Sequence, residues 1–177
     1  MKYYSAFMVF DVESIGLHGE GFAVGFVVIA PDGTELDSAV YSCPPDMALG
    51  DIPDRAWIAE NVPAMEPTHG TPRQVRDAFW MKWREWADKG AALVADCAWP
   101  VEARFLCACV DDDQMTRDWS GPYPLYDLAS VFFAAGMDPN ATYPRLENEL
   151  PAHHPLMDAR QSARLLVEAL PLAFQEK

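Results

Sequence analysis

The sequence is poor in basic residues, with 13 lysines and arginines against 27 aspartates and glutamates and a formal net charge of −14. A surface of this sign argues against tight binding of long nucleic acid, because such binding depends on lysine and arginine at the phosphates. If the substrate is a nucleic acid, we therefore expect it to be short or single-stranded.

Long hydrophobic runs are also missing. The longest, 22–30, falls well below the ~20 apolar residues that cross a bilayer. The apolar opening of the chain is broken by Asp11 before any signal-peptide cleavage pattern appears. These absences predict no membrane partner and a cytoplasmic location.

The four cysteines form neither a C-x-x-C pair nor a zinc-finger pattern with histidine, so we expect reduced thiols, mostly buried: Cys43, Cys97, Cys107 and Cys109. What the chain does have is a half-hydrophobic composition over 177 residues, enough for one sizeable core. A single domain over 1–177 is therefore expected.

Hydrophobic patterning predicts three strands first and then alternating helices and strands. Apolar runs at 5–10, 22–30 and 34–42 predict an antiparallel meander, and the second and third are joined by a Pro-Asp-Gly turn. Capping residues and helical spacing then predict a helix over 71–90, with Val75, Phe79, Trp83 and Trp86 on its inner face. The remaining predicted elements are a strand at 91–95, a helix at 100–109, a strand at 124–128, and helices at 128–135 and 156–174.

The segment 43–70 stands apart because it is rich in proline and acidic residues and long for a connection. Trp57 and Ile58 are its only obvious anchors. We expect this segment to be either functional or loosely packed.

Two carboxylates follow the first strand. Residues two apart on a strand point to the same side, so Asp11 and Glu13 project together. Two converging carboxylates repel each other unless a divalent cation lies between them, and their hard oxygens favour Mg²⁺ or Mn²⁺. A D-x-E pair is weak on its own, but here it ends a buried apolar strand, where an uncompensated charge is costly.

The longer strings around these acids resemble the DEDDh exonucleases, the superfamily of polymerase proofreading subunits, ribonuclease T and oligoribonuclease. Residues 11–17, DVESIGL, with AVGFVV at 23–28, resemble its first motif, and residues 153–159, HHPLMDA, match its third motif, H-x-x-x-x-D-A. The resemblance covers most of the chain except 43–70. It implies a ribonuclease H-like α/β fold, with a mixed five-stranded sheet and helices on both faces.

The middle motif departs from the family pattern N-x-x-F-D-x-x-F-L, since residues 96–106 are DCAWPVEARFL. Anchoring on Phe105-Leu106 makes Glu102 the counterpart of the family aspartate, although a glutamate there is also an ordinary helix-dipole partner. Anchoring on the end of the strand favours Asp96, which is otherwise a cap or turn residue. Both stay open, and Asp96 is preferred because its strand end lies beside the first strand.

The resemblance implies two-metal hydrolysis at the 3′ end of a nucleic acid, with release of nucleoside 5′-monophosphates. The residues implied are Asp11, Glu13, Asp158 and one middle acid for two Mg²⁺ or Mn²⁺ ions, His153 as general base, and Gly16 and Leu17 for the substrate. His154 is the fallback for the base. Trp57 is a candidate for stacking on a base. Relatives also suggest a homodimer.

Two other functions remain compatible with the same acids. One is a phosphohydrolase acting on free nucleotides, and the other is a non-catalytic binding or assembly module that has lost its metal. The sequence does not distinguish RNA from DNA, because a 2′-hydroxyl can be contacted by almost any polar group.

Overall fold

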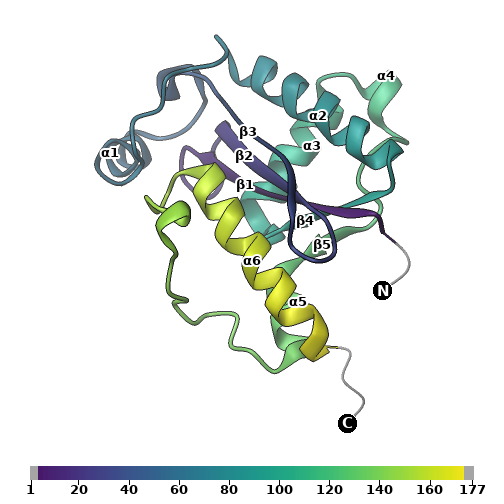
Figure 1. Cartoon of the computed structure of the whole chain (residues 1–177). Helices are drawn as coiled ribbons and strands as arrows, with labels where there is room; N and C mark the ends of the chain where they lie inside the picture. Colours follow the sequence, from purple (N-terminus) through teal and green to yellow (C-terminus); the bar gives the residue numbers. More distant parts are fainter. Residues whose placement is uncertain (1–3, 174–177) are drawn as a thin grey trace.

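The computed structural model describes residues 4–173 and contains one five-stranded sheet (Figure 1). The strands are β1 (Ala6–Ser14), β2 (Gly21–Ile29), β3 (Glu35–Ser42), β4 (Ala91–Ala95) and β5 (Leu125–Asp127), in the spatial order β3-β2-β1-β4-β5. β1 pairs antiparallel with β2, and β2 with β3, whereas β1–β4 and β4–β5 are parallel. The predicted mixed sheet with its antiparallel meander is confirmed.

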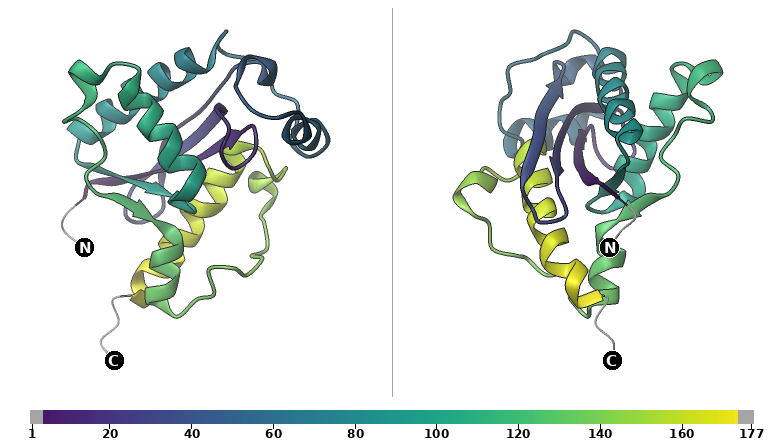
Figure 2. Two further views of the ribbon diagram at one scale, coloured as in Figure 1. Left: turned by 180° about the vertical axis from the view of Figure 1, so that it is seen from behind. Right: turned by 45° about the vertical axis from the view of Figure 1, so that its right-hand side comes forward.

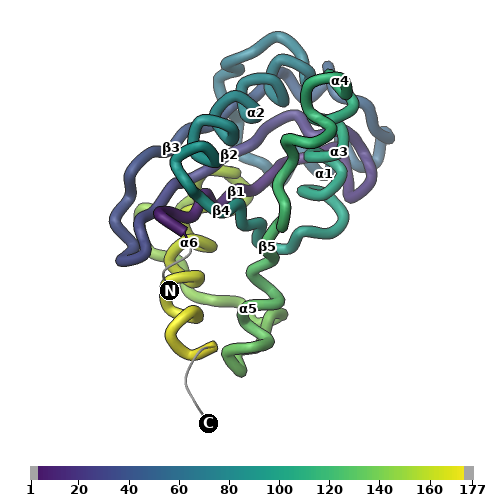
Figure 3. The backbone as a smooth tube through the Cα atoms, turned by 90° about the vertical axis from the view of Figure 1, so that its right-hand side faces the viewer, coloured from purple at the N-terminus to yellow at the C-terminus, as the bar shows by residue number. Residues whose placement is uncertain are grey.

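Within residues 4–173, six α-helices accompany the sheet: α1 (Ile52–Asn61), α2 (Pro72–Asp88), α3 (Ala103–Asp111), α4 (Gln114–Arg117), α5 (Leu128–Ala135) and α6 (Pro155–Ala173). Figure 3 shows α2 and α3 on the opposite side of the strands from α5 and α6, as predicted. α1 lies at one edge of the molecule, away from both layers (Figures 1 and 2). Phe174, the predicted end of the last helix, lies outside the described residues. No helix within 4–173 is both long and apolar enough to cross a membrane.

The side chains of β1 alternate between two hydrophobic cores, because successive strand residues point to opposite faces. Met8 and Phe10 pack in the core beneath α2 and α3, while Phe7 and Val9 pack in the core beneath α5 and α6. Asp11 and Glu13 point to the same face as Phe7 and Val9, so the strand places both carboxylates on the α6 face of the sheet.

β1 is longer than predicted. The apolar run was expected to end before Asp11, but the strand continues to Ser14 because Asp11 pairs with Gly25 and Glu13 with Ala23 on β2. The backbone that carries both carboxylates is therefore fixed by the pairing of β1 with β2, and neither residue lies in a loop.

The helix predicted over 100–109 is also different. An irregular helical turn, Ala98–Glu102, precedes α3, and Trp99 inside it has extended backbone angles (φ −115°, ψ 134°). Residues before proline avoid the helical region, which accounts for the interruption at Trp99-Pro100. The regular helix begins only at Ala103.

The segment 43–70 contains a helix that patterning missed. α1 buries only Ile58, so it has no continuous apolar stripe. It is held instead by a close approach at its N-terminal side, where a Cβ added to Gly50 would overlap with Ile15. This segment is thereby fixed against the turn that follows Glu13.

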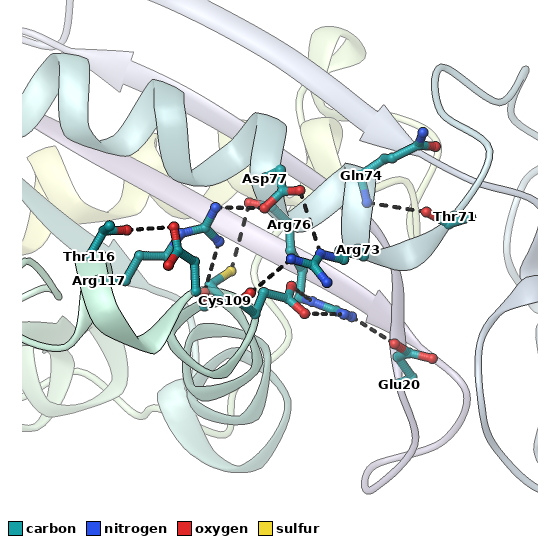
Figure 4. Close-up of polar contacts among 11 residues, drawn as sticks. Glu20, Thr71, Arg73, Gln74, Arg76, Asp77, Cys109, Thr116 and Arg117 are labelled. Carbon is teal, nitrogen blue, oxygen red and sulfur yellow. Dashed lines mark hydrogen bonds and ion pairs between the residues drawn. The ribbon is translucent and has the colours of Figure 1, made fainter.

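A buried ion network joins α2 to the ends of α3 and β2 (Figure 4). The guanidinium of Arg76 donates to Asp112 through Nε at 2.6 Å and to Glu20 through Nη1 at 2.7 Å. Arg117 pairs in the same region with Asp77 at 2.6 Å. Asp112 thus compensates the buried charge of Arg76.

All four cysteines are free. Cys43 and Cys109 are buried, but Cys97 and Cys107 are exposed, so the expectation that most are buried holds for only two of them.

Candidate active site

The N-terminus of α6 is packed directly onto β2 opposite Asp11. Gly25 pairs with Asp11, and a Cβ at Gly25 would overlap with backbone atoms of Pro155 and Leu156. Because glycine has no side chain, the first turn of α6 can approach the strands at this point. That approach brings Asp158 close to the carboxylates of β1.

Asp158 and His153 meet Glu13 at this place. One potential ligand atom from each of these three side chains lies within 4.8 Å of the other two. The backbone N–H of His153 donates to Asp158 Oδ2 at 3.1 Å, and His153 adopts a left-handed conformation with φ 60°. The turn before α6 is thus closed by Asp158 in a way that directs His153 towards the acids.

His154 lies differently. Its Nδ1 atom is buried and has no hydrogen-bond partner within the described chain, and burial lowers the pKa of its imidazole. Of the two histidines, only His153 belongs to the cluster with Glu13 and Asp158.

Glu102 is brought to the site by the irregular turn before α3. Its side chain is buried, and its negative charge raises the pKa of both Asp11 and Glu13. Asp96 lies at the exposed end of β4, and of the two β1 carboxylates it raises the pKa of Asp11 alone, more weakly than Glu102 does. Glu102 is therefore the middle acid with the stronger electrostatic contact to the β1 pair.

The acids of the site make one another harder to ionise. Burial, followed by repulsion from Asp158 and Glu102, raises the pKa of Asp11 well above its usual range and that of Glu13 to about 8. Burial also raises the pKa of Glu102 to about 7, against the effect of backbone hydrogen bonds. Burial raises the pKa of Asp96 as well, while a hydrogen bond with Ser162 lowers it.

None of Asp11, Glu13 and Glu102 forms an ion pair with a lysine or arginine within residues 4–173. Carboxylates that are buried together without counter-charge, and that offer only oxygen, fit hard divalent cations. His153 adds a nitrogen donor at the rim of the same cluster. The donor set is thus compatible with the metal ions implied by the sequence.

Sequence reasoning missed Arg145. Its Nη1 atom lies 2.6 Å from Asp158 Oδ1, and the same atom donates to the carbonyl of Glu149 at 3.0 Å. Arg145 stands in an irregular segment thirteen residues before Asp158, where no motif or periodicity marks it. Only the fold brings the two side chains together.

The segment 43–70 also reaches the site. Trp57 of α1 packs against His153, with ring centroids 5.3 Å apart and an interplanar angle of 81°. Such an edge-to-face contact is a favoured aromatic geometry. The sequence suggested that Trp57 stacks on a nucleobase of the substrate. In the structure its aromatic partner is His153, the candidate general base.

A cavity of about 680 Å³ lies around the turn between β1 and β2, and its lining includes none of Asp11, Glu13, Glu102, His153 and Asp158. Its walls include Ile15 and Leu17, which follow Glu13, and Phe105 and Arg104 of α3. Leu17 is 65% exposed, and Gly16 has φ 69°, a backbone conformation that favours glycine. The volume lies in the range typical of sites for small organic ligands.

Several solved structures of exonuclease I share this architecture. Exonuclease I from Methylocaldum szegediense aligns with a TM-score of 0.61 and 16% identity, over 95% of this chain and 42% of that one. A product-bound exonuclease I gives 0.57 and 16%, over 96% and 43%. E. coli exonuclease I in complex with a 5cy-dT13 oligonucleotide gives 0.57 and 14%, over 96% and 42%. The chain has the fold of these exonuclease I structures.

The resemblance inferred from the motifs is therefore confirmed at the level of the fold. The chain spans less than half of the length of these exonuclease I chains. No protein-family model and no curated protein sequence matches it.

Proposed function

We propose that the protein is a metal-dependent 3′-to-5′ exonuclease that acts on short or single-stranded nucleic acid. The observation that carries this proposal is the convergence of Asp11, Glu13, Glu102 and Asp158 with His153 at the end of β1, on a fold shared with exonuclease I. β1 supplies Asp11 and Glu13, the irregular turn before α3 supplies Glu102, and the turn before α6 and the start of that helix supply His153 and Asp158.

Asp11, Glu13, Glu102 and Asp158 would hold two Mg²⁺ or Mn²⁺ ions. When bound, the ions supply the Lewis-acid stabilisation of the attacking and leaving oxygens at phosphorus. Glu102 is proposed as the middle ligand, in place of the earlier preference for Asp96, because it is buried and acts on both carboxylates of β1. Asp96 remains the alternative ligand.

His153 is proposed as the general base. A ring nitrogen of His153 would accept a proton from the attacking water, and its position beside Glu13 and Asp158 supports this role. Its orientation is held on one side by its own backbone bond to Asp158 and on the other by Trp57. The products would be a nucleoside 5′-monophosphate and a shortened strand.

Gly16 and Leu17 are proposed to contact the terminal nucleotide. Leu17 follows Glu13 closely in the sequence and presents an exposed apolar side chain on the wall of the cavity. Bases stack on apolar and aromatic side chains irrespective of sequence, which fits a substrate held locally by a strongly acidic protein. The homodimer expected from the resemblance stays a prediction.

A ladder assay tests the proposal. RNA and DNA oligonucleotides labelled at the 5′ end are incubated with Mn²⁺ and with wild-type protein or Asp11→Asn, and a control digestion uses free nucleotide triphosphate. We expect stepwise shortening from the 3′ end by the wild type alone. Cleavage of free nucleotides instead would favour a phosphohydrolase, and no hydrolysis of either would favour a binding module. Activity retained in Asp11→Asn would contradict the site.

A further inference from the structure

Arg145 is the cation of the candidate site. Nη1 donates to Asp158 Oδ1 at 2.6 Å and to the Glu149 carbonyl at 3.0 Å, which uses both of its hydrogens. Nε and Nη2 make no hydrogen bond to any residue in 4–173, although only 24% of the side chain is exposed. Three donors of a guanidinium beside the acids are thus left for another acceptor.

The backbone that presents Arg145 is fixed to α6. Glu149 is almost fully buried, and its carboxylate accepts from Arg164 of α6 at 2.6 and 3.0 Å and from the backbone N–H of Leu146 at 2.9 Å. Arg164 also donates to the carbonyl of Pro144 at 2.9 Å. The turn on both sides of Arg145 is therefore held in place before any ligand binds.

The balance of charges in the proposed complex leaves the phosphodiester of the substrate for the guanidinium of Arg145 to bind. Four carboxylates would be balanced by two divalent cations, so the phosphodiester of a substrate would bring a negative charge without a partner. Guanidinium groups bind phosphate oxygens through charge-assisted hydrogen bonds, often with two donors at once.

We propose that Arg145 is a phosphate-binding residue of this site, which pairs with Asp158 through Nη1 and offers Nε and Nη2 to a phosphate oxygen of the nucleic acid. The proposal rests on the proposed function. It differs from a purely structural role, in which Arg145 only holds Asp158 in position.

Two binding measurements separate these roles. Mn²⁺ binding is followed by the electron paramagnetic resonance of the free ion, without nucleic acid. Oligonucleotide binding is followed by fluorescence anisotropy in Ca²⁺, with fluorescein-labelled oligothymidylate and oligouridylate that carry a 3′-terminal phosphorothioate and are checked for intactness on a gel. The proteins are wild type, Arg145→Gln, Arg145→Lys and Arg160→Gln. Arg160 is a matched control, since it is equally exposed and pairs with Glu35 away from the acids.

For Arg145→Gln we expect the oligonucleotide Kd to rise at least tenfold, while Mn²⁺ binds as tightly as to the wild type or several-fold more tightly. The salt dependence of binding should fall by about 0.7 in the slope of log K against log salt, as expected for one lost phosphate contact on a single strand. The oligonucleotide Kd of Arg145→Lys should lie between those of the wild type and Arg145→Gln, and the Kd of Arg160→Gln should match that of the wild type.

Unchanged oligonucleotide binding by Arg145→Gln would overturn the proposal. So would a loss of Mn²⁺ affinity as large as the loss of oligonucleotide affinity, because that result would mean that Arg145 only positions Asp158. If the wild type itself binds neither Mn²⁺ nor oligonucleotide, the proposed function fails, and this outcome is distinct from a failure of Arg145 alone.

Discussion

The indole of Trp57 and the imidazole of His153 lie nearly perpendicular, with centroids 5.3 Å apart. His153 stands in a turn with φ 60°, so its ring projects from a constrained backbone and meets α1 on one side and Asp158 on the other. The segment 43–70, which lies outside the resemblance to known exonucleases, is thus part of the wall around the candidate base.

This contact predicts that Trp57→Ala lowers kcat while leaving Mn²⁺ binding unchanged. An aromatic pair contributes about 0.5–1.5 kcal/mol, which corresponds to a decrease of roughly 2- to 12-fold if the contact orients His153 for the reaction. Trp57→Phe should retain most of the activity. Ile52→Ala, at an 83% exposed position of the same helix, is the control. A change in KM alone would assign Trp57 to substrate binding and not to His153.

Glu102 and Asp96 are expected to differ in metal binding. Glu102→Gln should abolish turnover and weaken Mn²⁺ binding at least tenfold, because it removes a buried carboxylate that acts on both Asp11 and Glu13. Asp96→Asn should retain measurable Mn²⁺ binding. Calorimetric titration of both variants with Mn²⁺ checks this, and the reverse order would make Asp96 the middle ligand.

Stability of the metal-free protein should fall as pH rises. The folded-state pKa of Glu13 is raised to about 8 and that of Glu102 to about 7, so the folded protein holds more protons than the unfolded chain above pH ~4.5. The free energy of unfolding therefore decreases as pH rises from ~4.5 to the folded-state pKa of each group, about 8 for Glu13 and about 7 for Glu102. The decrease is at most about 1.4 kcal/mol per pH unit for each group. The lowered pKa of His154 acts in the opposite direction below pH ~6.5.

Thermal melts from pH 5 to 8 in EDTA and in Mn²⁺ test this dependence. The decrease should be present in EDTA, smaller in Glu13→Gln, and reversed by Mn²⁺, which is bound only by the ionised carboxylates. A melting temperature in EDTA that is the same in wild type and Glu13→Gln at every pH would contradict the raised pKa of Glu13.

Gly25→Ala should damage both stability and the site. The new Cβ overlaps with the backbone at Pro155 and Leu156, which cannot move as a side chain can. Overpacking of this kind costs about 1–3 kcal/mol, and the shift of α6 would separate Asp158 from Asp11. Gly121→Ala, where no atom lies within 4 Å of the new Cβ, should stay within about 0.5 kcal/mol of wild type in chemical denaturation. Equal stabilities of the two variants would refute the close approach.

Much of the sheet could be predicted from the sequence because strands and long helices carry their own periodicity. The helix predicted at 128–135 illustrates this, since the side chain of Asp127 caps α5 and Gly136 ends it in a left-handed conformation. α1 could not be predicted in this way, because it buries a single side chain and depends on contacts with the turn at Ile15.

In the candidate site, too, some residues could be predicted from the sequence and others could not. Asp11, Glu13, His153 and Asp158 could be named as candidates because the motifs keep them at fixed spacing, and the structure places them near one another. The choice between Glu102 and Asp96 was open because an irregular turn intervenes between β4 and α3, so that neither strand nor helix spacing applies. The role of Arg145 depends on a tertiary contact with no pattern in the sequence.

The alternation of β1 has a consequence for sequence change. Inserting or deleting one residue between Phe7 and Asp11 would rotate the remainder of the strand by half a turn. The two carboxylates would then enter the aromatic layer around Phe79, and Phe10 would face His153 and Asp158. The number of residues in this strand is therefore more strictly constrained than the type of residue at each position. A shift of one residue would move the two carboxylates from the candidate site into a hydrophobic core, where their charges would be uncompensated.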